Sequence, residues 1–496
     1  MKPDKSLLLL ILLLAIFSCR NKPGTNCPVI SKLPVISPDY TQVTIPVNIA
    51  PLNFSISTTG EDCYVEISGS KGKAFALHPR NGQVIIPVGQ WKNLLAANAN
   101  DSIHFRIFEK KNGVWARYPE FSQYVSDAPI DRFLYYRMLY PGYESWSEIS
   151  IVQRSLENFA EKTVVQNNTI DQNCVNCHAF NRNNPGDFMI HVRGSHGGTL
   201  FLKDGALTKF NLKTAEMENG AVYPRWHPSG KYVAFASNKV IQQFHALAEK
   251  RIEVSDLNSS LVLFDLEKNE MMDIPCGDKK VNMDTYPEWS PDGKMLYFCR
   301  ADAVGKDWDY TQVRYNLYRI PFDPAQRAFG QPELLLDAAK NGKSVSFPRV
   351  SPDGKQIVFT RHDYGCFPIW HKEADLYSLV PGDSVIHQMA LNSDQTDSYH
   401  SWSENSTWLV FSSKRGDGLT ARPYIACVDE QGNAHKPFVL PQQDPGLYDR
   451  LIKSFNVPEL SNAEVSFLPE ELRKAAAAKA IPVLQGKAQS GLSPVQ

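Results

Sequence analysis

The 496-residue sequence lacks a charge imbalance and lacks the motifs of the common enzyme classes. Its 52 basic and 53 acidic residues nearly cancel, which argues against a nucleic-acid surface and against a patch for anionic membranes. It contains no Gly-x-Ser-x-Gly elbow, no P-loop and no dinucleotide fingerprint. No motif therefore supports a hydrolase or transferase, a nucleotide cofactor or a nucleic-acid partner.

The sequence has a short apolar run at residues 7–17 and lacks any apolar run of membrane length after it. Lys2 and Lys5 precede this run, as in a secretory signal, and it is too short to span a bilayer as a stable anchor. It ends at Phe17-Ser18-Cys19, which resembles the bacterial lipobox, in which the cysteine becomes the lipidated N-terminus. The alternative is an ordinary cleaved signal followed by an incidental cysteine.

We therefore expect residues 1–19 to be a lipoprotein signal peptide, with lipidation at Cys19. Residues 20–38 contain several prolines and are predicted to be a flexible linker. The expected location is the cell envelope, at the outer membrane on its periplasmic side or its surface. Contact with the membrane would be through the lipid anchor only.

The clearest positive feature is a repeat that reads aromatic-Pro-x-Trp-Ser-Pro-Asp-Gly-Lys, followed by alternating apolar residues. Copies begin at Tyr223, Tyr286 and Phe347, and a decayed copy begins at Tyr399. Pro-Asp-Gly-Lys predicts a turn, because Pro fixes φ and Gly accepts a positive φ. The alternation predicts strands. Repeats of this length, each with about four antiparallel strands, predict a β-propeller.

This repeat resembles the TolB-type, WD40-like propeller repeat over roughly residues 199–440. The resemblance implies a fold and leaves the function open, because such propellers serve as partner-binding platforms, lectin-like domains and enzyme lids. Within 129–445 we predict a divergent blade at 131–168, a second at 170–217 and four repeats over 221–440. The expected propeller has six blades, and seven is the alternative.

The rest of the chain flanks this propeller. Residues 39–128 alternate apolar and polar side chains between Asn-Gly turns, which predicts a β-sandwich of immunoglobulin-like type. Trp91 and Trp115 are expected in its core. Residues 446–496 are predicted to be a tail with one short helix starting near Leu468. The whole fold is therefore expected to be all-β.

Three connections are long for a propeller: 240–257, 301–313 and the insertion 361–371. Long loops on one face usually build a binding surface. The insertion carries four aromatic and histidine residues that we predict to belong to a partner-binding surface: His362, Tyr364, Trp370 and His371. Local packing of a long loop is the alternative.

The motif with specific chemistry is Cys174-Val-Asn-Cys177-His178, the attachment pattern of c-type haem. Two thiols at this spacing bond to the two former vinyl groups of one porphyrin, and the adjacent imidazole binds the iron. The predicted export of the protein is consistent with this motif, because c-type haem is attached outside the cytoplasmic membrane. The alternatives are a structural disulfide or a metal clip. A single motif excludes a multihaem wire.

If haem is present, His178 is the proximal ligand. The expected sixth ligand is His191, on an alternating stretch that gives its side chain a defined direction, and His196 and Met189 are further candidates. An exported propeller with one such motif resembles a poorly characterised group of bacterial lipoproteins, sometimes labelled as cytochrome-related.

Two functions follow from these observations. The first is a lipid-anchored envelope propeller with one covalent c-type haem, for electron transfer or redox sensing coupled to partner binding. The second is a redox-silent platform for a protein, peptide or glycan, in which Cys174 and Cys177 form a disulfide or metal clip. In both, the partner is a protein or glycan of the cell envelope.

Overall fold

The computed structural model describes residues 22–24, 26–58, 60–143, 146–247, 250–305 and 307–491. The predicted signal peptide and the lipidation site Cys19 lie outside these residues. The described chain forms two compact units, and each is described by itself. In the described ranges, no helix is long and apolar enough to cross a membrane.

The first unit consists mainly of residues 51–125, with the residues before Val43 and a short segment at 442–446. One sheet has the order β9-β7-β4-β5, with β8 beside β7, and a second has the order β1-β3-β6. The elements are β1 (Ile36–Ser37), β3 (Phe54–Ile56), β4 (Asp62–Gly69), β5 (Phe75–Leu77), β6 (Gln83–Val84), α2 (Val88–Ala97), β7 (Asp101–Lys111), β8 (Val114–Arg117) and β9 (Phe121–Ser126).

The core of this unit contains Trp91, as predicted, but the residue lies on helix α2. Trp91 is fully buried together with Leu94 and Leu95, and this i, i+3, i+4 spacing places all three on one helix face. The sequence analysis expected only strands here, because the apolar run that ends at Val88 hides a helix start after Pro87. Trp115 is only half-buried, and the Lys110 ammonium lies 6.0 Å from its ring centroid.

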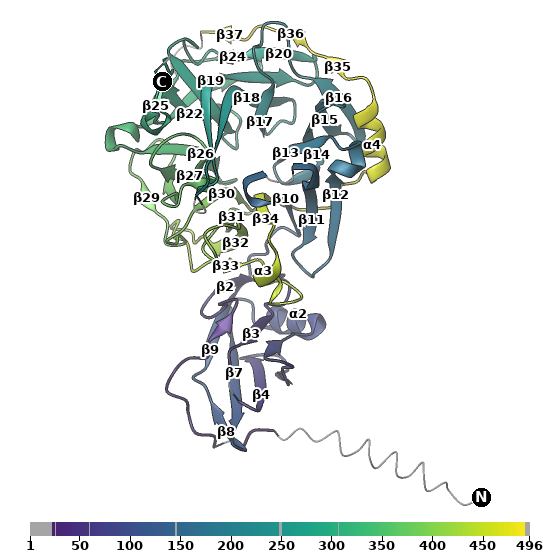
Figure 1. The fold of residues 1–496 in the computed structure, drawn as a ribbon, viewed down its shortest axis with the longest axis vertical. Helices are drawn as coiled ribbons and strands as arrows, with labels where there is room; N and C mark the ends of the chain where they lie inside the picture. Colours follow the sequence, from purple (N-terminus) through teal and green to yellow (C-terminus); the bar gives the residue numbers. More distant parts are fainter. Residues whose placement is uncertain are drawn as a thin grey trace, which may run out of the picture. The chain divides into compact units, whose positions relative to one another are not determined.

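The second unit is the predicted propeller, and the described residues form six blades arranged in a ring (Figure 1). We call the axis of this ring, where the inner strands line two pockets, the channel. Blade 1 is β13 (Cys174–Asn181), β14 (Asn184–Arg193), β15 (Gly198–Lys203) and β16 (Ala206–Asn211); blade 2 is β17 (Ala221–Trp226), β18 (Tyr232–Phe244), β19 (Ile252–Asp265) and β20 (Glu270–Asp273). Blade 3 is β21 (Asn282–Trp289), β22 (Met295–Asp302), β23 (Asn316–Asp323), β24 (Ala328–Phe329) and β25 (Glu333–Leu336). Blade 4 is β26 (Ser344–Val350), β27 (Ile357–His362), β28 (Asp375–Leu379) and β29 (His387–Gln388); blade 5 is β30 (Asp397–Trp402), β31 (Trp408–Ser413), β32 (Arg422–Cys427) and β33 (Phe438–Val439).

Blade 6 joins the two ends of the propeller and corrects the predicted tail. Its strand order is β12-β11-β10-β34, with β10 (Phe133–Leu139), β11 (Ser150–Ser155), β12 (Glu161–Gln166) and β34 (Ser454–Ser461). Residues 454–461 therefore form the strand next to the channel, although the sequence analysis placed them in a tail. The prediction missed this strand because its partner, β10, lies more than three hundred residues earlier in the chain.

The remaining C-terminal residues run along the outer edge of the ring (Figure 1). After α3 (Leu447–Arg450) and the short helix α4 (Pro469–Ala477) come β35 (Ile481–Pro482), β36 (Leu484–Gln485) and β37 (Gln489–Ser490). These three strands pair in parallel with β16, β20 and β24, the outer strands of blades 1, 2 and 3. Exposed sheet edges invite aggregation, and this tail covers them.

The innermost strand of every blade carries a β-bulge at the same place. The bulged residues have a φ between 46° and 53° and are Cys177, Tyr223, Tyr286, Phe347, Tyr399 and Val457. In four blades a proline follows, and proline has no N–H for the ladder. In blades 1 and 5 the following residue is His178 or His400. The second half of the Cys-x-x-Cys-His motif thus occupies the repeat's aromatic-Pro position.

Candidate functional site

The bulges surround a pocket at the end of the channel where the inner strands begin. Its cavity volume is about 190 Å³, and the inner strands of all six blades contribute to its wall. Cys177 and His178 are on this wall, together with the bulged aromatic residues of the other blades. The second half of the predicted motif, Cys177 and His178, therefore lies at the mouth of the channel.

Part of the wall is a row of aromatic rings. The rings of Tyr223 and Tyr286 are 4.5 Å apart, those of Tyr286 and Phe347 are 4.0 Å apart, and those of Phe347 and Tyr399 are 4.8 Å apart. Burial holds the pKa of Tyr286 well above its usual value, so its hydroxyl stays neutral. Such a surface suits an apolar ligand with aromatic rings, because aromatic rings pack well against one another at these distances.

His178 is a buried polar residue of this wall. It is only 4% exposed, and its Nε2 atom has no hydrogen-bond partner among the described residues. The nearest carboxylate oxygen is Oε2 of Glu459, 3.8 Å away. Burial and the charge of Arg137 lower the pKa of His178 to about 3. The imidazole is therefore neutral and can act as an electron-pair donor.

The two motif thiols lie in different surroundings. Cys177 is on the pocket wall, whereas Cys174 packs against the apolar cluster shared by blades 6 and 1. Burial raises the pKa of Cys174, and the charges of Arg193 and Arg137 oppose that rise. Cys174 is paired across the ladder with Arg193, which does line the pocket. Both thiols are free in the structure.

The three candidates for a sixth iron ligand are not among the residues that line the pocket. His191 is hydrogen-bonded through Nδ1 to Oγ1 of Thr199 at 3.0 Å, and burial lowers its pKa to about 4. His196 contacts Asp171 at 2.9 Å, and Met189 is fully buried in the apolar core. The described residues bring no group of three or more His, Cys, Asp or Glu side chains together as a metal site.

The sequence analysis missed a buried belt of charges that forms the floor of the pocket. Arg225 Nε lies 2.5 Å from Glu288 Oε2, and Arg349 Nη1 lies 3.4 Å from the same oxygen. Arg225 Nη1 is 3.8 Å from Glu459 Oε1. Burial lowers the pKa of Arg349 to about 9 and raises the pKa of Glu459 to about 7. A second pocket of about 140 Å³ lies beyond this belt and shares its residues.

A signal for the belt was present in the repeats. Three of its residues directly follow the proline of an aromatic-Pro unit, in Tyr223-Pro-Arg225, Tyr286-Pro-Glu288 and Phe347-Pro-Arg349, and Glu459 follows Val457-Pro458. Residues two apart on a strand point to the same side. The charged residue therefore lies one step deeper in the channel than the bulged aromatic residue.

The insertion after β27 buries three of its four predicted aromatic and histidine residues, and Tyr364 is half-buried. His362, Trp370 and His371 are 1%, 6% and 3% exposed, and none of them is among the residues that line the pocket. This burial favours local packing, the alternative interpretation, over a partner-binding surface. Trp370 packs in the core shared by blades 3 and 4, because Pro368 turns the chain inward through a short 3-10 helix, Pro368–Trp370.

The burial of His400 can be tested by measuring how stability depends on pH. Its Nε2 is 2.8 Å from the carbonyl oxygen of Val358, and burial lowers its pKa to about 3. Because the unfolded chain has a pKa near 6.5, acid favours unfolding, and stability falls as the pH drops from about 6.5 toward 3. Between about pH 7 and about pH 5, we expect the unfolding free energy of the parent protein to fall by about 2 kcal/mol more than that of His400→Gln. Urea unfolding at both pH values measures this, and equal losses in both proteins would contradict it.

Comparison with known proteins finds only distant similarities to solved structures. No protein-family model and no curated protein matches the sequence. Solved structures that it resembles include TolB from Acinetobacter baumannii, with a TM-score of 0.41 and 12% identity over 75% of this chain and 85% of that one. A hypothetical selenium-binding protein from Sulfolobus tokodaii has a TM-score of 0.45 and 10% identity over 68% of this chain and 96% of that one. An oligogalacturonate lyase from Vibrio parahaemolyticus has a TM-score of 0.32 and 13% identity over 67% and 85%. Similarities this weak give no information about the function of this chain.

Proposed function

We propose that the channel mouth holds a c-type haem and that the protein transfers electrons, or senses redox state, for a partner in the cell envelope. The observation that carries the proposal is the buried Nε2 atom of His178, which has no hydrogen-bond partner among the described residues and lies on the same wall as Cys177. A buried imidazole nitrogen without a partner is costly, and coordination would satisfy it.

The rest of the wall agrees with this ligand. A porphyrin is flat, apolar and carries two carboxylates. Aromatic rings tilted by 52° and 34° to one another offer an apolar surface, and Arg193 lies at the pocket as a cation for a carboxylate. When bound, haem supplies one-electron chemistry. This chain's own residues would attach it through Cys174 and Cys177 and bind its iron through His178.

The size of the pocket bears on electron transfer. Its volume of about 190 Å³ is below the range of about 300–1,000 Å³ that is usual for enclosed ligands. A porphyrin would therefore remain partly exposed at the mouth, as exchange of electrons with a partner requires.

The face around the mouth is suited to a partner. The second strand of each blade returns to this face, so the connections after β18, β22 and β27 all lie there. These are the long connections noted in the sequence, and long loops on one face are typical of a binding surface. A lipid tether at Cys19, which lies outside the described residues, would keep this face in the envelope.

Expression of the full chain in a host with a haem-attachment system tests the proposal. We expect a Soret band that survives acid-acetone extraction and a haem-stained band on a denaturing gel. Cys177→Ser should lose most of the covalent haem, because this thiol is on the pocket wall, and Cys174→Ser should lose less. Cys27→Ser, a half-buried cysteine outside the propeller, is the matched control and should retain it.

Colourless protein from that host would exclude the haem. The second function, a redox-silent platform, would then remain. An intact mass lower by two hydrogens, with the loss mapped to Cys174 and Cys177, would identify the disulfide form of that platform.

A further inference from the structure

The hairpin of β18 and β19 extends far beyond the rest of its blade. The sequence analysis expected a loop over 240–257, but Val240–Phe244 pair with Ile252–Asp256 as strands. Asn238, Val240, Gln242 and Val254, all on this extension, line the channel-mouth pocket. The hairpin therefore contributes to a wall that otherwise consists mainly of inner strands, with Arg137, Arg193 and Phe367 from other elements.

The base of the extension is tied to its neighbours by a buried carboxylate. Asp256 is 3% exposed. One of its oxygens accepts a hydrogen bond from Asn238 Nδ2 at 2.8 Å, and the other accepts from the hydroxyl of Tyr315 at 2.9 Å and from the thiol of Cys366 at 3.5 Å. Tyr315 precedes β23 of blade 3, and Cys366 belongs to the insertion of blade 4.

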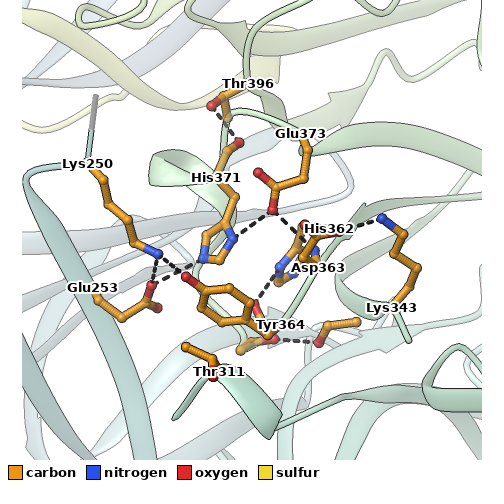
Figure 2. A network of polar contacts seen from close by, with 12 residues as sticks. Lys250, Glu253, Thr311, Lys343, His362, Asp363, Tyr364, His371, Glu373 and Thr396 are labelled. Atoms are coloured by element: carbon orange, nitrogen blue, oxygen red, sulfur yellow. Dashed lines mark hydrogen bonds and ion pairs between the residues drawn. The ribbon is translucent and has the colours of Figure 1, made fainter. Parts of the chain in front are cut away.

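The far part of the extension is held by a second network, shown in Figure 2, in which Glu253 and His371 are buried. Glu253 is 1% exposed. Its Oε2 lies 2.6 Å from Lys250 Nζ and 3.3 Å from His371 Nε2. Lys250 Nζ donates to the hydroxyl of Tyr364 at 2.5 Å. Nδ1 of His371 is 3.0 Å from Glu373 Oε1. We call this network, from Lys250 and Glu253 to Tyr364, His371 and Glu373, the clamp.

The clamp joins two elements that have no common sheet. Lys250 and Glu253 belong to the hairpin of blade 2, and the other three residues belong to the insertion of blade 4. Burial lowers the pKa of His371, but its contacts with Glu253 and Glu373 outweigh burial and raise it above its usual value. The carboxylates of Glu253 and Glu373 thus favour the protonated form of His371.

A two-stranded extension needs such support. An isolated hairpin is marginally stable in water, and this one exposes apolar side chains, with Phe244 70% exposed and Val240 42% exposed. A buried ion-pair network costs desolvation and is weak evidence for overall stability. Its position between hairpin and insertion suggests a different use, which is to fix the hairpin beside the pocket.

We propose that the β18–β19 hairpin is a cover of the channel mouth and that the clamp holds it closed, so that the clamp determines how large a molecule can reach Cys177. Only the identity of the natural ligand rests on the proposed function. Breaking the Glu253–His371 contact frees the far end of the hairpin, widens the mouth and admits bulkier molecules to the same wall.

The test uses the full chain produced without haem attachment, so that Cys177 is a free thiol. Alkylation of Cys177 by iodoacetamide, a small reagent, and by a bulky dye-maleimide is followed by peptide mass spectrometry. In Glu253→Gln and His371→Gln we expect the bulky reagent to react about tenfold faster or more, since breaking a buried pair costs well over 1.4 kcal/mol. The rate with iodoacetamide should change much less.

Glu470→Gln is the matched control. It removes the same charge from an exposed ion pair with Arg473 on α4, and its rates should equal those of the parent. Tyr364→Phe removes one clamp hydrogen bond and serves as a milder variant if the others fold poorly. Unchanged reaction with the dye-maleimide in folded clamp variants would overturn the cover. Because no step involves haem, this result is independent of the haem experiment.

Discussion

A chain that ends at Lys453 is expected not to form a closed propeller. The deletion removes β34, whose residues pair with β10 from Phe133 to Leu139. Phe455 and Leu460 of β34 are buried, and their loss exposes the core of blade 6. A ring with an open blade also exposes the edges of both neighbouring strands. We expect loss of the cooperative unfolding transition of the propeller, followed by tryptophan fluorescence, together with aggregation.

A chain that ends at Gly486 is the control for this truncation. It loses β37, which adds only the pairs Ala328–Gln489 and Phe329–Ser490 to blade 3, and it keeps β34 and α4. Its transition should remain cooperative and shift by a few degrees. A truncation at Lys453 that unfolds like the full chain would show that the three strands β10, β11 and β12 close the ring without β34.

Removal of the Glu288 carboxylate is expected to destabilise the propeller strongly. Glu288 lies between Arg225 and Arg349 in the floor of the channel, and no other carboxylate contacts both of them in the described residues. Glu288→Ala would leave two buried cations with less compensation, which costs about 3–5 kcal/mol. Glu288→Gln should cost less, because the amide oxygen still accepts a hydrogen bond. Urea unfolding measures both.

The control for Glu288→Ala is Glu333→Ala. Glu333 pairs with Arg319 at 2.9 Å, but its side chain is 53% exposed, and surface pairs contribute less than about 1 kcal/mol. Equal losses for the two variants would mean that water reaches the belt and screens it. The belt would then not separate the two ends of the channel.

Most of the ring was predictable because its signal is local. Each Pro-Asp-Gly turn and the strands beside it lie within one stretch of sequence. Blade 6 was predicted only in part, because its inner strand, β34, comes from the other end of the propeller. Val457-Pro458-Glu459 does repeat the pattern of Tyr286-Pro-Glu288, but no Pro-Asp-Gly turn follows it, so the match is too short to stand out.

The candidate site was likewise predictable only in part. Cys174, Cys177 and His178 were predicted from one motif, whereas the pocket wall takes residues from all six blades. No local pattern can show which aromatic residues face one another across a channel. The choice of His191 rested on the alternation of β14, but alternation does not say which side faces the channel. Its imidazole contacts Thr199 of the next strand.

The joining of both chain ends in one blade has a consequence for the timing of assembly. Contacts distant in sequence form late, since they wait for the whole intervening chain. β10 is synthesised early and β34 near the end, so the ring has an open side for most of its synthesis. During that interval Cys177 and His178, in the blade beside the gap, can be reached from the side as well as through the mouth. A rigid molecule too wide for the finished entrance can be attached before the gap closes, and the completed ring then retains it.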